Sequence, residues 1–193
     1  INDYDWSPDS KQIVFSYNSD PKINTNMVDA NISIVSADSS SLIAIVDRPG
    51  PDTNPKFSPD GSKIAFQSTG GQPEPIGLRD LYVINLNGGK SQALTQTPDR
   101  FSNIIDWSSD GKSLLVSEAH HTSRVALMVS ADPNNKSKPK IISDQSGISG
   151  SFSVNKNQLA YVFQTPNTPA ELFISNIKKE PKYKGRDEEA RKQ

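Results

Sequence analysis

The chain has 193 residues, of which 33% are hydrophobic and 22% charged, and its formal net charge is −1. The absence of cysteine excludes disulfide frameworks, thiol catalysis and Cys-ligated zinc. The near-neutral charge gives no broad cationic field for nucleic acid, and no apolar run approaches the ~20 residues of a membrane span. The chain begins at Ile1 without an initiator methionine, so we expect it to be an internal piece of a longer protein.

One segment occurs four times along the chain and aligns without a gap. It reads DWSPDSKQIVFS from Asp5, KFSPDGSKIAFQ from Lys56, DWSSDGKSLLVS from Asp106 and SFSVNKNQLAYV from Ser151. A second segment recurs between these copies at intervals of 45 to 49 residues, beginning at Ile32, Leu81, Ala126 and Glu171. Because two separate segments keep one period, the chain contains a true internal repeat.

Each repeat predicts four short β-strands, of which the first ends at an aromatic residue: Trp6, Phe57, Trp107 or Phe152. A type I turn follows, complete as Ser58-Pro59-Asp60-Gly61, in which Pro presets φ and Gly is favoured at the fourth position. The second strand is a continuous apolar run, such as 64–66, which predicts burial on both faces. The third strand is the second recurring segment, and the fourth is short and polar, as suits an outer edge.

The four-part repeat predicts an all-β fold, a partial β-propeller of about four blades with four antiparallel strands each. We expect blades at 1–48, 49–98, 99–145 and 146–193. The last blade is incomplete, because 178–193 carries 11 charges in 16 residues and no fourth strand. A helical solenoid and another repeated all-β arrangement are the alternatives. The solenoid lacks support, because no window shows sustained i, i+3, i+4 apolar spacing and Pro interrupts almost every connection.

The aromatic residues that end the first strands are expected to pack between neighbouring blades, with the first strands lining a central channel. Two long inserts follow the second strands of the first two repeats, at 17–31 and 68–79. These inserts make the repeats uneven in length.

The clearest copy of the repeat runs from Lys56 through DLYVINLNGG at 80–89 to Leu94-Thr95. This pattern resembles the repeat of the propeller domains in the prolyl oligopeptidase family of serine peptidases, and that of TolB. The uneven repeats and long inserts favour the peptidases over TolB, whose blades are nearly uniform, and among the peptidases we expect the dipeptidyl and acylaminoacyl branch in particular. The resemblance covers nearly the whole chain, and it is specific for a fold rather than for a reaction.

If the resemblance holds for function, the chain is a noncatalytic propeller that gates access of short peptides to an active site. The family implies a C-terminal α/β-hydrolase domain beyond residue 193, which would carry the Ser, Asp and His of the catalytic triad. It also implies a periplasmic or secreted location slightly more than a cytoplasmic one. The alternative is a TolB-like propeller that acts as a protein-interaction module in the cell envelope.

The chain itself carries no predicted catalytic constellation. A Gly-x-Ser-x-Gly elbow is absent, as are the glycine spacings of dinucleotide-binding and phosphate-binding loops, so no cofactor is expected. His120 and His121 are adjacent, and on an extended strand they would point to opposite faces, so no metal site is expected.

A polar patch at the propeller rim is the candidate substrate-binding site. It comprises Glu118, His120, His121 and Arg124 around the second hairpin of the third blade. In the dipeptidyl peptidases that the chain resembles, acidic propeller residues can hold the free amino terminus of the substrate, which Glu118 could do here. Asp52 and Asp99, in the connections that enter the second and third blades, are equally possible.

Overall fold

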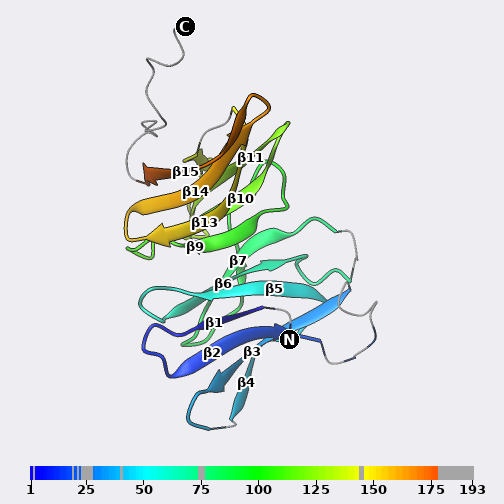
Figure 1. The fold of residues 1–193 in the computed structure, drawn as a ribbon. Helices are drawn as coiled ribbons and strands as arrows, with labels where there is room; N and C mark the ends of the chain where they lie inside the picture. Colours follow the sequence, from blue (N-terminus) through cyan, green and yellow to red (C-terminus); the bar gives the residue numbers. More distant parts are fainter. Residues whose placement is uncertain are drawn as a thin grey trace, which may run out of the picture.

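Four groups of strands follow one another along the chain and stack side by side in space, from the N-terminal group to the C-terminal group (Figure 1). The computed structural model describes residues 1, 3–18, 20, 22, 28–39, 41–73, 77–143 and 146–177. All fifteen elements of these residues are strands. No helix in this part of the chain has the length and apolarity to cross a membrane.

Each group is one antiparallel blade. Blade 1 contains β1 (Tyr4–Trp6), β2 (Gln12–Tyr17), β3 (Asp29–Ser36) and β4 (Leu42–Val46). Blade 2 contains β5 (Gly50–Phe57), β6 (Lys63–Ser68), β7 (Asp80–Asn85) and β8 (Gln92–Ala93). Blade 3 contains β9 (Asn103–Trp107), β10 (Ser113–His120), β11 (Ser123–Ser130) and β12 (Lys140–Ile141). Blade 4 contains β13 (Ile148–Asn155), β14 (Gln158–Thr165) and β15 (Thr168–Asn176).

A short parallel pairing joins each blade to the next. β3 meets β5 where Asp29 pairs with Gly50, and β11 meets β13 where Arg124 pairs with Ile148. An isolated parallel bridge between residues 79 and 101 occupies the same place between blades 2 and 3. The strands thereby form one eight-stranded and one seven-stranded sheet, both open. This arrangement confirms the prediction of an all-β partial propeller.

In the first three blades, the turn after the first strand is closed by its own serine and aspartate. In blade 2 the Ser58 hydroxyl donates to Asp60 Oδ1 at 2.6 Å, and the Gly61 N–H donates to the Ser58 carbonyl at 2.8 Å. Gly61 takes a φ of 70°, a conformation that costs glycine little. The hydrogen bonds from Ser58 and Ser62 lower the pKa of Asp60 to about 2. The turn residues therefore fix the hairpin register as the sequence pattern predicts.

The hydrophobic core is divided into three clusters, each lying between two consecutive blades. In the middle blades the second strands are buried on both faces, as predicted, with five consecutive buried residues in β6 and in β10. The same prediction is wrong for the outer blades. β2 and β14 alternate between buried and partly exposed residues, because one face of each lacks a neighbouring blade in this chain.

The aromatic residues at the first-strand ends follow the same rule. Trp107 is 2% exposed and Phe57 is 5% exposed, each within an inter-blade cluster, and Phe152 packs against the third cluster. Trp6 departs from the prediction and is 51% exposed, because no blade covers its face here. The charged segment 178–193 and parts of both inserts lie outside the described residues.

Candidate functional site

Glu118 is not a surface residue, although the sequence placed it in a polar patch at the rim. Its side chain is 1% exposed and faces blade 2. The carboxylate accepts hydrogen bonds from Ser102 Oγ at 2.8 Å and from the backbone N–H of Asp99 at 3.4 Å. Ser102 Oγ also lies 2.8 Å from Thr97 Oγ1. Glu118 thus ties the segment that enters blade 3 to β10, and its carboxylate is turned away from solvent.

The other three predicted residues, His120, His121 and Arg124, lie at the tip of the β10–β11 hairpin and do not form a common site with Glu118. Arg124 pairs with Ala119, one position along from Glu118, so it lies on the opposite face of the blade and is exposed. The expectation that the two histidines point apart is wrong. His121 lies in the turn with a φ of 53°, which brings its ring to 4.6 Å from that of His120, measured between ring centroids. The described residues nonetheless contain no group of three His, Asp or Glu side chains placed to hold a metal ion.

Asp52 is fully buried and is held by an arginine that the sequence reasoning missed. Arg48 donates from Nε to Asp52 Oδ2 at 3.2 Å and from Nη2 to Oδ1 at 3.0 Å. Its guanidinium also lies over the rings of Phe66 and Tyr82, 5.9 and 5.1 Å from their centroids. Burial raises the pKa of Asp52, and its hydrogen bonds with Arg48 and Ser68 oppose that rise. The pair fastens the connection between blades 1 and 2.

A second arginine–aspartate pair lies between blades 2 and 3. Arg100 donates from Nη2 to Asp80 Oδ2 at 2.7 Å and from Nε to Oδ1 at 3.0 Å. Arg79 stacks over the Phe101 ring at 5.8 Å and donates to Thr53 Oγ1 at 3.3 Å. The Arg48–Asp52 and Arg100–Asp80 pairs therefore each hold a blade connection against a neighbouring strand. Asp99, next to Arg100 in sequence, is exposed and donates its backbone N–H to Glu118.

The ends of the four first strands converge on one concavity of about 320 Å³, and every blade contributes to its lining. Lys56 Nζ forms an ion pair with Asp5 Oδ1 at 3.1 Å, across the junction of blades 1 and 2. The Phe57 N–H donates to the other oxygen of Asp5 at 2.9 Å. Asp106 stands at the equivalent position of blade 3, and burial raises its pKa. The chain therefore presents charged groups where its blades meet.

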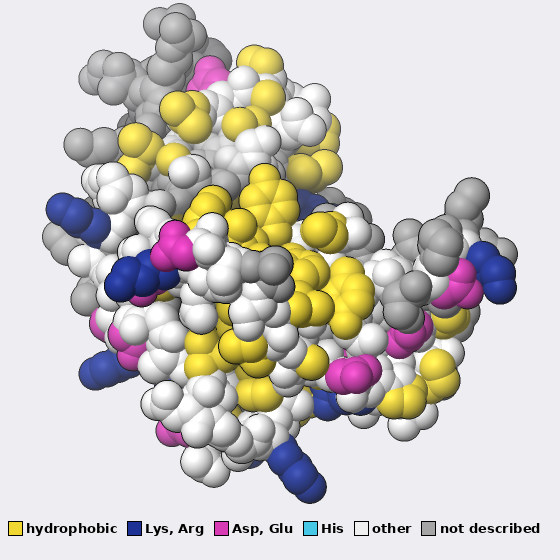
Figure 2. Space-filling model, turned by 90° about the horizontal axis from the view of Figure 1, so that it is seen from below, with side chains coloured by type: hydrophobic (Ala, Val, Ile, Leu, Met, Phe, Trp, Pro, Cys, Tyr) yellow, Lys and Arg dark blue, Asp and Glu magenta, His cyan; other side chains and the backbone are white. Residues whose placement is uncertain are grey.

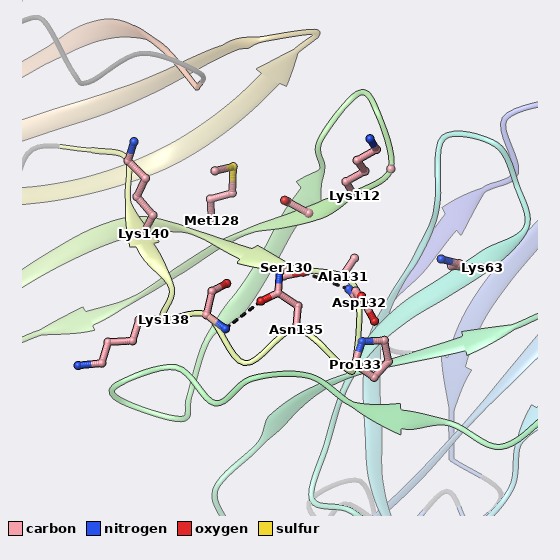
Figure 3. A pocket seen from close by; sticks show the side chains of 13 residues that line it. Lys63, Lys112, Met128, Ser130, Ala131, Asp132, Pro133, Asn135, Lys138 and Lys140 are labelled. Atoms are coloured by element: carbon pink, nitrogen blue, oxygen red, sulfur yellow. Dashed lines mark hydrogen bonds between the residues drawn. The ribbon is translucent and has the colours of Figure 1, made fainter.

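A larger cleft of about 600 Å³ lies on the outer side of blades 2 and 3. Lys63, Lys112, Lys138 and Lys140 border it, with Asp132 as the acidic member of its lining. Figure 3 shows the four lysine side chains spread around the cleft, with their ammonium groups pointing apart rather than toward a common centre. The cleft lacks the convergent polar groups of a specific small-molecule site.

The convergence of the first strands is therefore the candidate functional site. It unites the ends of four repeats that are far apart in sequence, whereas the predicted residues of the β10–β11 hairpin form no common site. Part of the signal for it was present in the recurring first-strand ends, since Asp5-Trp6, Phe57 and Asp106-Trp107 all line the concavity.

Comparison with known proteins supports the fold. Dipeptidyl-peptidase 5 of Trichophyton equinum is 26% identical over 207 residues, which cover 95% of this chain and 28% of the relative. The chain thus spans little more than a quarter of that relative. TolB from Acinetobacter baumannii superposes with a TM-score of 0.67 at 17% identity, over 92% of this chain and 41% of TolB. A puromycin-hydrolyzing peptidase of Mycobacterium tuberculosis gives 0.66 at 13% identity, over 93% and 28%.

The two solved structures are less than 25% identical to this chain, so they establish the fold and not a reaction. The sequence pattern of the TolB beta propeller domain matches residues 4–178, which include every described strand. The chain belongs to the TolB beta propeller domain family.

Proposed function

We propose that this chain is part of the substrate-gating propeller of a serine peptidase of the prolyl oligopeptidase family, of the dipeptidyl or acylaminoacyl type. The observation that carries the proposal is the similarity to dipeptidyl-peptidase 5 along 95% of the chain. The catalytic α/β-hydrolase domain then belongs to sequence on the C-terminal side of residue 193. The four blades of the gate correspond to 1–48, 49–98, 99–145 and 146–193.

Steric exclusion supplies the physical basis for gating. The first-strand ends of the four blades surround a small concavity, and a passage a few side chains wide admits an extended peptide but not a packed domain. The Asp5–Lys56 pair crosses one blade junction at this place. Both side chains are about a quarter exposed, so an entering peptide can reach the pair from solvent.

Two measurements test the peptidase assignment. The coding sequence downstream of residue 193 is expected to contain Gly-x-Ser-x-Gly after a predicted strand. The protein that includes that sequence is expected to be labelled by a fluorophosphonate, and the 193-residue chain alone is not. A folded protein that includes the downstream sequence and resists labelling would refute the peptidase assignment.

The gating role needs its own experiment in the catalytic protein. Lys56→Ala removes the ion pair at the first-strand ends and is expected to raise the hydrolysis rate of longer peptides without changing that of a dipeptide reporter. Lys63→Ala, in the outer cleft, is the matched control. Equal effects of Lys56→Ala on short and long peptides would contradict gating at this place.

A protein-interaction module of the TolB type is the second candidate, favoured by the superposition on TolB with a TM-score of 0.67. In that case, a stop codon follows the last blade and no hydrolase domain exists. The downstream sequence therefore distinguishes the two functions.

A further inference from the structure

The connection between the third and fourth strands is longer in blade 3 than in blades 1 and 2. It spans 131–139 in blade 3, but only 37–41 in blade 1 and 86–91 in blade 2. Insertions into one copy of a repeat map to loops, and often to a binding surface. The blade 3 connection, ADPNNKSKP, carries two lysines, and Lys140 follows it directly. The departure of blade 3 from the repeat therefore brings positive charge to one place on the propeller.

Hydrogen bonds hold this connection in place. The Asn135 N–H donates to the Asp132 carbonyl at 3.0 Å, and the Asn135 side-chain oxygen accepts the Ser137 N–H at 2.9 Å. Thr95 Oγ1, from the segment that follows β8 in blade 2, donates to the Asn135 carbonyl at 2.8 Å. The backbone that carries the lysines is thus anchored both to itself and to the neighbouring blade before any partner binds.

Lysine side chains without an acidic partner border the outer cleft beside this connection. Lys112, Lys138 and Lys140 of blade 3 are exposed, and Lys63 of blade 2 is partly exposed. Among the residues that the structure describes, none of these lysines forms an ion pair, whereas four other cations of the chain do. Asp132, the acidic member of the lining, accepts a backbone N–H within its own turn at 2.9 Å. The cleft therefore carries excess positive charge in a chain whose formal net charge is −1.

The cleft belongs to the junction of the two middle blades. Its lining comes from blades 2 and 3, each of which has a neighbouring blade on both sides in this chain. Seen from the blade 1 end, hydrophobic side chains occupy the middle of the molecule, and Lys and Arg side chains stand apart from one another toward its margins (Figure 2). The gathering of lysines is thus a property of the blade 2–blade 3 junction and not of the surface in general.

The positions of the lysines limit the chemistry of a ligand. Their ammonium groups point apart (Figure 3), which disfavours a compact anion such as phosphate and favours negative charges spread along a chain. The lining includes no aromatic residue and no arginine, the groups that stack on bases and clasp phosphates. Because a residue before proline favours an extended backbone, Lys138 and Lys140 flank Pro139 at an interval of ~7 Å, as do alternate residues of a strand. These features fit an extended acidic peptide.

We propose that this cleft docks an extended acidic segment of a partner protein, whose alternate carboxylates bind Lys112, Lys138 and Lys140. Charge complementarity carries the proposal, because a partner supplies the negative charge that the described residues do not. Met128 and Ala131, also in the lining, offer apolar contact between the charged positions. The cleft shares no lining residue with the concavity at the first-strand ends. This docking therefore goes beyond the gating role and does not depend on peptidase activity.

Fluorescence anisotropy tests the docking. The probe is a short N-acetylated peptide of alternating glutamate and serine that carries a neutral fluorophore, and the same peptide with glutamine in place of glutamate is the uncharged control. Saturable binding is expected for the glutamate peptide only, and it should weaken as added NaCl screens the charges. The double variant Lys138→Glu/Lys140→Glu should weaken binding about tenfold or more, because two attractive contacts become repulsive.

Lys11→Glu is the matched control, since Lys11 is exposed and occupies in blade 1 the repeat position that Lys112 has in blade 3. Lys11→Glu should bind the probe like the wild type, whereas Lys112→Glu should bind it more weakly. Circular dichroism checks that each variant is folded.

Three outcomes overturn the proposal. The glutamate peptide does not bind, or it binds the double variant as well as the wild type, or Lys11→Glu weakens it as much as Lys112→Glu does. The lysines then serve only to keep the outer edge strand from pairing with another chain. An oligothymidylate that binds more tightly than the peptide, with the same sensitivity to the variants, would replace the acidic peptide by single-stranded nucleic acid.

Discussion

The middle blades and the outer blades are built from the same repeat, yet they bury it differently. Phe66 in β6 is fully buried, whereas Phe15, at the matching position of β2, is only partly buried. Trp107 and Trp6 differ in the same way. A single blade therefore has no complete core of its own. Whether a repeat position becomes interior depends on the neighbouring blade, which explains why nearly identical local sequences reach different degrees of burial.

Substitution of the two tryptophans should separate middle from outer blades most strongly. Trp107→Ala removes a buried ring and its hydrogen bond to Lys56, and should lower the free energy of unfolding by ~3–5 kcal/mol. Trp6→Ala at the equivalent position of blade 1 should change it by about 1 kcal/mol or less, because the side chain is 51% exposed. Urea denaturation at low protein concentration measures both. Equal losses would contradict the distinction between middle and outer blades.

The second effect concerns the place where an outer blade joins a middle one. Arg48→Ala leaves the buried Asp52 carboxylate without its cation, and should cost about 2–4 kcal/mol at neutral pH. The loss should shrink as the pH is lowered. Burial already raises the pKa of Asp52, removal of Arg48 raises it further, and protonation removes the buried charge.

Thermal melting of Arg48→Ala and wild type across a pH series measures this difference. Lys22→Ala is the control on the outer blade, since the Lys22–Asp20 pair is exposed at the surface and contributes little. A loss in Arg48→Ala that stays constant from neutral to acid pH would argue against an uncompensated Asp52 charge.

The smallest effect is a gain in stability at the first-strand ends. Burial raises the folded-state pKa of Asp106 above its ordinary 3.8, so the unfolded chain releases this proton at a lower pH than the folded chain. The contribution of Asp106 to the free energy of unfolding is therefore largest below pH 3.8, its ordinary pKa. This contribution is lost as the pH rises past the higher pKa that Asp106 has in the folded chain. Asp106→Asn keeps a side-chain oxygen that accepts the backbone N–H of Trp107. The substitution should raise the melting temperature slightly at neutral pH. The gain should vanish below the unfolded-state pKa, and its persistence there would point to another cause.

Much of the fold could be predicted from the sequence, because the determinants of each hairpin are local. The recurring aromatic, the Ser-Pro-Asp-Gly turn and the apolar run fix strand positions and register within a blade. Blade pairing was also predictable, because successive repeats are neighbours in space. The exposure of Trp6 was not, since the repeat alone does not tell which blades have a neighbour on each side.

The candidate site was harder to predict, because its contacts join residues from different connections. Glu118 was expected at the surface as a carboxylate near a strand end, but Ser102 and the Asp99 N–H, both far along the chain, satisfy it in the interior. The His121 ring meets His120 because the turn places His121 at positive φ, which an extended-strand argument does not anticipate. Arg48 could have been suspected from its place four residues before an acidic residue in a blade connection.

The way in which blades adjoin also bears on how the molecule opens. Each core cluster connects only consecutive blades, so cooperativity passes along the array by nearest-neighbour coupling, as in linear repeat proteins. An array of this kind frays from its termini. Amide hydrogen exchange should then be fastest in β1 and β15 and slowest in β6 and β10, with the gradient flattening wherever a further blade covers an end.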